Sequence, residues 1–260
     1  MKRTIVFLAA LILVVSSCLS AVRAEGTWDC PTPGCGRTGN RGNYCGGCGH
    51  PAPWMVSVGE YITYGHYEQD SNKTNGKESI EWLVLAKEGA KVLLISRYGL
   101  DTRQYHDSDP YPTWEKSDIR WWLNGTFLNE AFTAEEQAGI VTTTVRTPGY
   151  ISYSGGADTQ DQIWLLSRDE AEKYFSTLAS RKTTPTAYAV ARGVWQYSGT
   201  EDYGRLNGEG CCWWWLRSPG FANNYASSIS QGGSLYSRNV NYASDAVRPA
   251  LWLDLDLAVF

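Results

Sequence analysis

The segment FANNYASSISQGGSLYSRNVNYASD, residues 221–245, lies between the blocks WWWLRSPG (213–220) and AVRPALWL (246–253). It consists almost entirely of Asn, Tyr, Ser, Gly and Ala, a composition that elsewhere is typical of linkers or disorder. The two flanking blocks are strongly aromatic and apolar, as buried strands are. We therefore expect a rigid core to hold the polar segment at both ends.

The residue types of this segment are those that dominate antibody contact loops. Tyr gives a large amphipathic contact area at low entropic cost, while Ser, Gly and Asn adapt their hydrogen bonds. Ile229, Leu235 and Val240 are spaced so that they could attach the segment to the core, which leaves other side chains facing outward. The predicted ligand-binding residues are Phe221, Asn223, Asn224, Tyr225, Ser228, Ser230, Tyr236, Arg238, Asn239, Asn241, Tyr242 and Ser244. The alternative is an ordinary polar loop and edge strand that binds nothing.

Arg217 and Arg248 lie inside the two flanking blocks. A buried guanidinium must be paired, so each is predicted to bond backbone carbonyls or a carboxylate and to fix one end of the segment. Direct contact with a ligand is the alternative. The consecutive residues 213–215 are all Trp and alternate across a predicted strand, so at least one faces the core and one could line the binding surface.

The amino end has the layout of a secretory signal. Lys2 and Arg3 precede an apolar run over residues 5–15, which is too short to span a bilayer. Residues 15–18, VSSC, resemble a lipobox in which Cys18 would be lipidated, whereas residues 22–24 fit ordinary signal peptidase. We expect a signal peptide over residues 1–24, or one ending at residue 17 in a lipoprotein, and an extracellular or cell-surface protein.

The charge of the remaining chain argues against nucleic acid as a partner. Residues 1–24 hold three basic residues and no acidic one, which leaves 20 basic and 27 acidic residues, a net charge of −7. Nucleic acids and anionic membranes favour basic proteins. The expected partner is instead a protein or glycan on a cell, phage or host surface, with membrane contact only through a lipid anchor.

Residues 25–50 contain four cysteines, Cys30, Cys35, Cys45 and Cys48, but few side chains that could form a core. The spacing C-x4-C, nine residues, C-x2-C, with Gly after each pair, resembles a zinc ribbon. The predicted cofactor is one structural Zn²⁺ bound by all four thiolates, which leaves no open position for catalysis. Two disulfides are the alternative, favoured by an oxidising compartment. Residues 51–57 are predicted to form a short linker.

Residues 58–260 show an α+β pattern of alternating strand and helix signals. The predicted strands are 61–64, 81–85, 92–96, 141–145, 163–166, 213–217 and 247–253, with short pieces around Ile229 and Leu235. Strands 81–85 and 92–96 are predicted to form a hairpin that turns around residues 88–89. The predicted helices are 117–124, 133–140, 167–175 and 185–192, the second and third opened by capping boxes.

These segments resemble a known family. ITYGHYEQD, LLISRYGLD, IWLLSRDEAEKYF, PTAYAVARG, WWWLRSPG and VRPALWL together resemble an uncharacterised bacterial family, domain of unknown function 6273, over nearly all of residues 58–255. The tail of that family is similar to C-type-lectin-like and formylglycine-generating-enzyme-like folds. The resemblance therefore implies a C-type-lectin-like domain over residues 58–260, and an N-terminal zinc ribbon fits it.

Some members of that family resemble the target proteins of diversity-generating retroelements, in which adenine-directed mutagenesis rewrites a stretch near the end of the gene. Asn codons of the AAY kind change at their adenines into codons for Tyr, Ser and other residues. The mixture of Asn, Tyr and Ser in residues 221–245 is what such a process would leave.

No sequence motif supports catalysis. The three histidines, His50, His66 and His106, lie in no nucleophile-base-orienter arrangement, and no G-x-S-x-G, H-E-x-x-H or phosphate loop is present. The lectin triplets Glu-Pro-Asn and Gln-Pro-Asp are also absent. We expect no enzyme and no catalytic cofactor. The alternatives are a structural or cell-envelope domain without a ligand and, more weakly, a formylglycine-generating-type oxidase.

Two further groups of residues, a cysteine pair and a set of aspartates, have explanations that involve no ligand or catalysis. Cys211 and Cys212 are adjacent, unlike the spaced cysteine pair of formylglycine-generating enzymes, and buried thiols are expected, with a strained vicinal disulfide as the alternative. Asp101, Asp107 and Asp109 could offer oxygen ligands to calcium, but an acidic solvated loop is the expected account.

Overall fold

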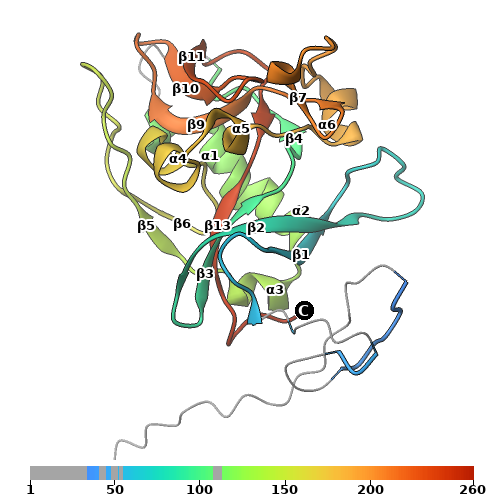
Figure 1. The fold of residues 1–260 in the computed structure, drawn as a ribbon. Helices are drawn as coiled ribbons and strands as arrows, with labels where there is room; N and C mark the ends of the chain where they lie inside the picture. The colour runs from blue at the N-terminus through green and yellow to red at the C-terminus, as the bar shows by residue number, and fades with distance from the viewer. Residues whose placement is uncertain (1–33, 41–44, 48–51, 53–54, 108–112) are drawn as a thin grey trace, which may run out of the picture.

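The computed structural model describes residues 34–40, 45–47, 52, 55–107 and 113–260 (Figure 1). The expected signal peptide, with Cys18, and two of the four ribbon cysteines, Cys30 and Cys48, lie outside the described residues. The remainder contains both helices and sheets, with strands predominating, which confirms the α+β prediction at that level.

Four strands form an antiparallel sheet in the order β1-β2-β3-β13. They are β1 (Tyr61–Tyr67), β2 (Glu78–Glu88), β3 (Lys91–Ser96) and β13 (Ala250–Asp254). β2 and β3 make the predicted hairpin. Every residue of β3 after Lys91 is buried, so this strand is covered on both faces, as its run of consecutive apolar residues requires.

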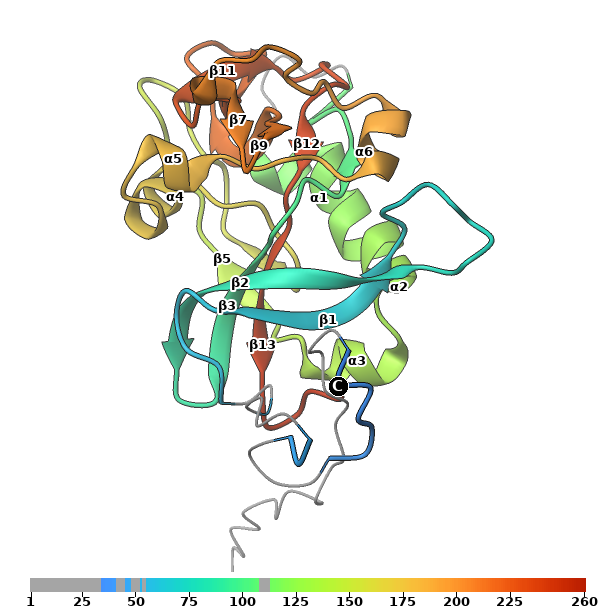
Figure 2. The same ribbon diagram turned by 45° about the vertical axis from the view of Figure 1, so that its right-hand side comes forward.

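Five strands form a second sheet in the order β11-β10-β9-β12-β4. They are β4 (Asp101–Thr102), β9 (Trp214–Pro219), β10 (Tyr225–Ile229), β11 (Leu235–Asn239) and β12 (Ala246–Val247). Only Arg248 and Pro249 separate β12 from β13, so the block AVRPALWL contributes to both sheets. Figures 1 and 2 show β9, β10 and β11 at the end of the molecule opposite the C-terminus.

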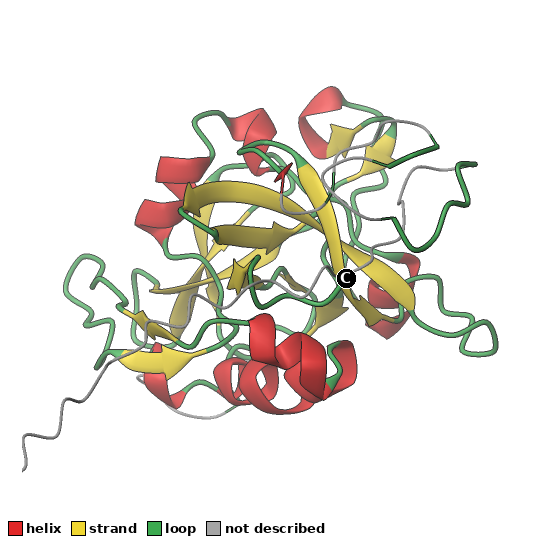
Figure 3. Ribbon diagram, turned by 90° about the horizontal axis from the view of Figure 1, so that it is seen from below, coloured by secondary structure: helices red, strands yellow, loops and turns green. Residues whose placement is uncertain are grey.

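Short helices cover the outside of the strands (Figure 3). They are η2 (Trp114–Lys116), α1 (Asp118–Trp122), η3 (Leu123–Phe127), α2 (Leu128–Ala131), α3 (Ala134–Gly139), α4 (Arg168–Tyr174), α5 (Leu178–Arg181), α6 (Ala187–Arg192) and η4 (Asp202–Gly204). Both predicted capping boxes are present, at Thr133 and at Ser167. Two small hairpins complete the fold, β5–β6 (Thr143–Val145, Thr159–Asp161) and β7–β8 (Arg205–Leu206, Glu209–Gly210). No helix among the described residues is long and apolar enough to cross a membrane.

Residues 163–166 differ from the sequence expectation of a buried strand. All four are buried, but only Trp164 pairs with a sheet, through an isolated bridge to Ala250. Asn124 supplies partners at the start of this stretch, because its Oδ1 accepts from the amides of Gln162 and Ile163 and its Nδ2 donates to the Ile163 carbonyl, while Arg217 donates to the carbonyls of Leu165 and Leu166. The Asn124 side chain on η3 therefore makes hydrogen bonds that a neighbouring strand would otherwise make.

Arg217 links β9 to the start of α4. Its side chain is 3% exposed and donates to the carbonyl oxygens of Leu165 and Arg146, both at 2.8 Å. It also bonds both carboxylate oxygens of Glu170, the residue that closes the capping box of α4. The guanidinium thus has carbonyl and carboxylate partners, the environment expected of a clamp next to residues 221–245.

Candidate ligand-binding face

The segment 221–245 forms the β10–β11 hairpin, and its two strands have different surroundings. β10 lies between β9 and β11, whereas β11 is an edge strand. Residues 226–229 of β10 are all buried, but Tyr236 on β11 is 53% exposed. The inner strand therefore fixes the hairpin to the core, and the edge strand presents side chains to solvent.

Ser228 and Ser230 were expected to face outward, and that expectation is wrong. Their exposed fractions are 0% and 5%. The Ser228 hydroxyl lies 2.9 Å from the Trp214 carbonyl and 2.8 Å from Asp245 Oδ2, while Ser230 Oγ accepts from the Ser234 amide inside the hairpin turn. Small hydroxyl side chains fit beneath a covering strand because the core supplies their hydrogen bonds.

Asp245 is a buried carboxylate under the hairpin, with 0% of its surface exposed. Oδ2 accepts from Ser228 on β10, and Oδ1 lies 3.3 Å from Nη2 of Arg238 on β11. Burial, which penalises the charged form, raises the pKa of Asp245 to about 6, although Arg238 and Ser228 oppose the shift. Asp245 therefore ties both strands of the hairpin to the chain that enters β12.

Arg238 organises an aromatic group on the outer side of the hairpin. Its guanidinium carbon lies 4.6 Å from the ring centroid of Trp213 and 4.3 Å from that of Tyr242. Trp213 in turn packs against Tyr236, with centroids 5.2 Å apart. Arg238 is only 27% exposed, so its main role is to hold these rings.

The other predicted contact residues lie outside this group. Phe221 is 55% exposed and packs against Tyr225 at a centroid distance of 4.7 Å. Asn241 and Tyr242 are exposed. We call the following set the display face; it contains the predicted residues that are exposed or half-buried, together with Trp213: Trp213, Phe221, Asn223, Asn224, Tyr225, Tyr236, Arg238, Asn239, Asn241, Tyr242 and Ser244.

A hollow of about 270 Å³ lies beside the hairpin turn. It is lined by Tyr203, Trp213, Ser230, Gln231, Gly232, Ser234 and Tyr236. The turn is held against α5, since Gly233 has a φ of +84° and a Cβ there would overlap the Leu178 carbonyl. Tyr203, Gln231 and Ser234 were not singled out from the sequence, because Tyr203 comes from a distant loop and the other two lack aromatic or charged groups.

The other side of the hairpin receives a charged side chain from α4. Arg168 Nη1 donates to the Tyr236 carbonyl at 3.3 Å, and its guanidinium carbon lies 4.0 Å from the ring centroid of Tyr150. No local sequence pattern predicts this contact, because the two partners are 68 and 18 residues away from Arg168 in the chain.

Cys211 and Cys212 are buried thiols, with 0% exposure and no disulfide. Burial raises the pKa of Cys211 to about 11 and raises the pKa of Cys212 further. The thiolate, which is the nucleophile and metal ligand, is therefore disfavoured at both positions.

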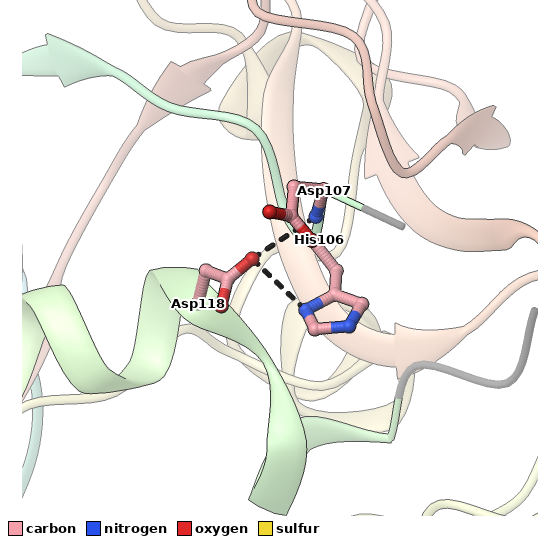
Figure 4. A group of neighbouring side chains, drawn as sticks. All are labelled: His106, Asp107 and Asp118. Carbon is pink, nitrogen blue, oxygen red and sulfur yellow. Dashed lines mark hydrogen bonds and ion pairs between the residues drawn. The ribbon is translucent and has the colours of Figure 1, made fainter. Parts of the chain in front are cut away.

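His106, Asp107 and Asp118 form a small polar group beside α1 (Figure 4). One carboxylate oxygen of Asp118 lies 3.0 Å from His106 Nδ1 and accepts from the Asp107 amide at 3.0 Å. Asp101, which was considered together with Asp107 for calcium, is 1% exposed and bonds Tyr67 and Arg192 instead. Asp109 lies outside the described residues. The contacts in Figure 4 attach the loop after β4 to α1.

Comparison with known proteins places the hairpin inside a recognised domain. Residues 89–255, which run from the β2–β3 turn through β13, match the family described as Domain of unknown function (DUF6273). The chain belongs to this family. The DUF6273 match confirms the sequence resemblance and includes the whole display face. No curated protein and no solved structure matches the chain.

The pKa of Asp245 predicts how stability of this DUF6273 domain depends on pH. Its carboxyl group titrates near 3.8 when unfolded and near 6 when folded, so the folded state binds the extra proton between these values. Stability from this group is fully present below the unfolded pKa and is lost as the pH rises through the folded pKa. We expect the free energy of unfolding, relative to Asp245→Asn, to fall by about 2 kcal/mol between about pH 4 and pH 7.

Urea unfolding of the two proteins across this pH range measures the difference. Asp256→Asn, which removes an exposed carboxylate, controls for the change in net charge. A stability difference between the parent and Asp245→Asn that is flat, or that increases with pH, would contradict the assignment.

Proposed function

We propose that this chain is an exported, surface-anchored ligand-binding protein whose contact surface is the display face. The observation that carries the proposal is that exposed aromatic rings stand on a hairpin whose inner strand is locked into the core. Phe221, Tyr236 and Tyr242 are 55%, 53% and 47% exposed, although each belongs to a residue type that favours burial at an interface.

The arrangement beneath the face makes it a pre-organised surface. Ser228 and Asp245 bond within the core, and Arg238 holds Trp213 and Tyr242 in place. Ordering a contact loop costs free energy when it binds, so rings that are already fixed retain more of their contact energy. A structural domain that merely packs its tail has no need of such an ordered aromatic group in solvent.

The same arrangement supports the proposal that the face is diversified by a retroelement. Side chains of the display face are exposed or half-buried, unlike the buried positions 226–229, so those other than Arg238 can change while the hairpin stays attached. Sequencing the gene's surroundings tests this. We expect a reverse transcriptase gene and a near-copy of the segment's DNA that differs only at adenines. A locus without either would contradict diversification but would leave ligand binding intact.

The proposed target is a protein or a glycan on a cell, phage or host surface. Both are compatible with a face that combines aromatic rings and amide groups and carries a single paired charge, that of Arg238. Screening of residues 25–260 on glycan arrays and against displayed surface proteins will identify which of the two is the target. For the target found, Tyr236→Ala and Tyr242→Ala are each expected to weaken binding by about tenfold or more, because exposed aromatic anchors carry most contact energy.

Leu257→Ala is the matched control for that measurement. Leu257 is also apolar and exposed, at 59%, but it lies near the C-terminus, at the far end from the hairpin (Figure 1). We expect the Leu257→Ala variant to bind the target with the same affinity as the parent protein. Equal affinity in all three variants would place the contact surface elsewhere and would contradict the proposal.

The C-type-lectin-like character of the domain is also proposed. It is supported by the quoted sequence segments, by the two sheets and by a final strand that lies in the body of the molecule beside β3. Superposition of an experimental structure on a lectin domain tests it. A formylglycine-generating-type oxidase is disfavoured by Cys211 and Cys212, whose thiols are adjacent, buried and poorly ionised.

We propose further that residues 25–50 bind one structural zinc ion. Among the described residues, Cys35 Sγ and Cys45 Sγ lie 3.7 Å apart. Two thiolates on one tetrahedral zinc, with bonds of about 2.3 Å, would be separated by about 3.8 Å. The Gly47 amide also donates to Cys45 Sγ at 3.4 Å, a contact that stabilises a negatively charged sulfur.

Elemental analysis of residues 25–260 tests this zinc site. We expect about one equivalent of zinc per chain, most of it lost in Cys45→Ser because a ligand is missing, and all of it kept in Cys211→Ser. A mass spectrum that shows two disulfides among the four ribbon cysteines in the purified protein would exclude the site.

A further inference from the structure

A cleft of about 530 Å³ lies away from the display face. Its walls come from β1 and β2, from the chain after β3, from α4 and α5, and from the β7–β8 hairpin. Tyr61, Tyr98 and Tyr174 contribute aromatic surface, and Leu83 and Leu206 contribute apolar surface. A cleft of this volume with such walls suits a small organic molecule.

Arg248 lines this cleft and is 3% exposed. Its Nε donates to the Ser96 carbonyl at 2.8 Å, which is the contact expected of a clamp. Its guanidinium carbon lies 5.2 Å from the ring centroid of Phe175 and 5.0 Å from that of Trp214. Nη1, however, has no hydrogen-bond partner among the described residues.

The charge of Arg248 is also unmatched. In the part of the chain that the structure describes, none of the ion pairs involves this residue. Burial lowers its pKa to about 10, so the guanidinium remains protonated at neutral pH. An unpaired buried cation is costly, whereas the equally buried Arg217 has Glu170 as its partner.

The other charged side chains that line the cleft either have polar partners within the protein or are exposed to solvent. Arg97 forms an ion pair with Glu81 at 3.1 Å, and Lys182 Nζ donates to the carbonyl oxygens of Asp202 and Arg205. Glu209 is exposed on the β7–β8 hairpin. The lining thus carries three cationic side chains and one anionic side chain. Arg248, whose Nη1 has no hydrogen-bond partner among the described residues, is the most buried of the three cations.

We propose that this cleft binds a small organic carboxylate, which pairs with the Arg248 guanidinium while its apolar body lies against the tyrosine and leucine walls. One negative charge neutralises one unmatched guanidinium, and a planar carboxylate fits its hydrogen-bonding geometry. The site is separate from the display face, so the two proposals can fail independently.

Fluorine NMR with para-fluorobenzoate and its neutral isostere para-fluorobenzamide tests the assignment on residues 25–260. We expect the carboxylate to bind and the amide to bind at least about tenfold more weakly, since only the carboxylate supplies a charge. Arg248→Met should weaken carboxylate binding by about tenfold or more.

Arg248→Met removes a buried side chain, so a second variant tests the cleft without touching it. Ala179 is exposed on α5 at the wall of the cleft, and Ala179→Trp should obstruct entry and abolish binding. Ser176→Trp, at an exposed neighbouring position outside the lining, should bind like the parent. If Arg248→Met does not fold, the ratio of carboxylate to amide affinity and the Ala179→Trp result decide the question.

Three results would overturn the proposal: no carboxylate binding at about 10 mM ligand, equal binding of carboxylate and amide, or unchanged binding in Ala179→Trp. A preference of tenfold or more for para-fluorophenyl phosphate over para-fluorobenzoate would also overturn it, because that preference would identify the cleft as a phosphate site.

Discussion

The structure depends on how the chain satisfies polar groups at the junction of its two sheets. The block AVRPALWL enters the five-stranded sheet as β12 and leaves it as β13 of the four-stranded sheet, with only Arg248 and Pro249 between. Residues 245–251 are all buried, so every polar group there needs a protein partner or a ligand. Arg217 and Asp245 have charged partners inside the domain, Glu170 and Arg238, whereas the described residues form no ion pair with Arg248.

That requirement explains the composition of residues 221–245. β10 has sheet neighbours on both edges and is buried along residues 226–229, where Ala226, Ser227 and Ser228 precede Ile229. The Ser hydroxyls then complete hydrogen bonds that an apolar strand would leave unmade, such as that of Ser227 to the Pro219 carbonyl. The composition that resembles a linker is thus a tightly packed inner strand followed by an exposed edge strand.

The sequence predicted features that rest on local patterns. Hairpin β2–β3 and both capping boxes follow from spacing within a few residues. The expected burial of Cys211 and Cys212 is confirmed as well. Whether a strand is inner or edge is decided by distant segments, which is why Ser228 was misplaced. For the same reason no pattern indicated that Arg168 and Tyr150 flank the hairpin, or that Arg248 lines a cleft.

Two arginines in equivalent sequence contexts thus have different chemical roles. Both follow an aromatic or apolar strand residue, both are almost fully buried, and both donate to backbone carbonyls. Arg217 faces the capping box of α4, where Glu170 supplies a carboxylate, so its charge is neutralised within the fold. Arg248 faces aromatic rings and a cleft, and none of the ion pairs among the described residues involves it. Because a buried guanidinium without a counter-ion destabilises the folded state, a carboxylate that enters the cleft would gain from a charge already held in place. Burial of a guanidinium charge is costly in both places. Glu170 offsets that cost for Arg217, and a bound carboxylate would offset it for Arg248.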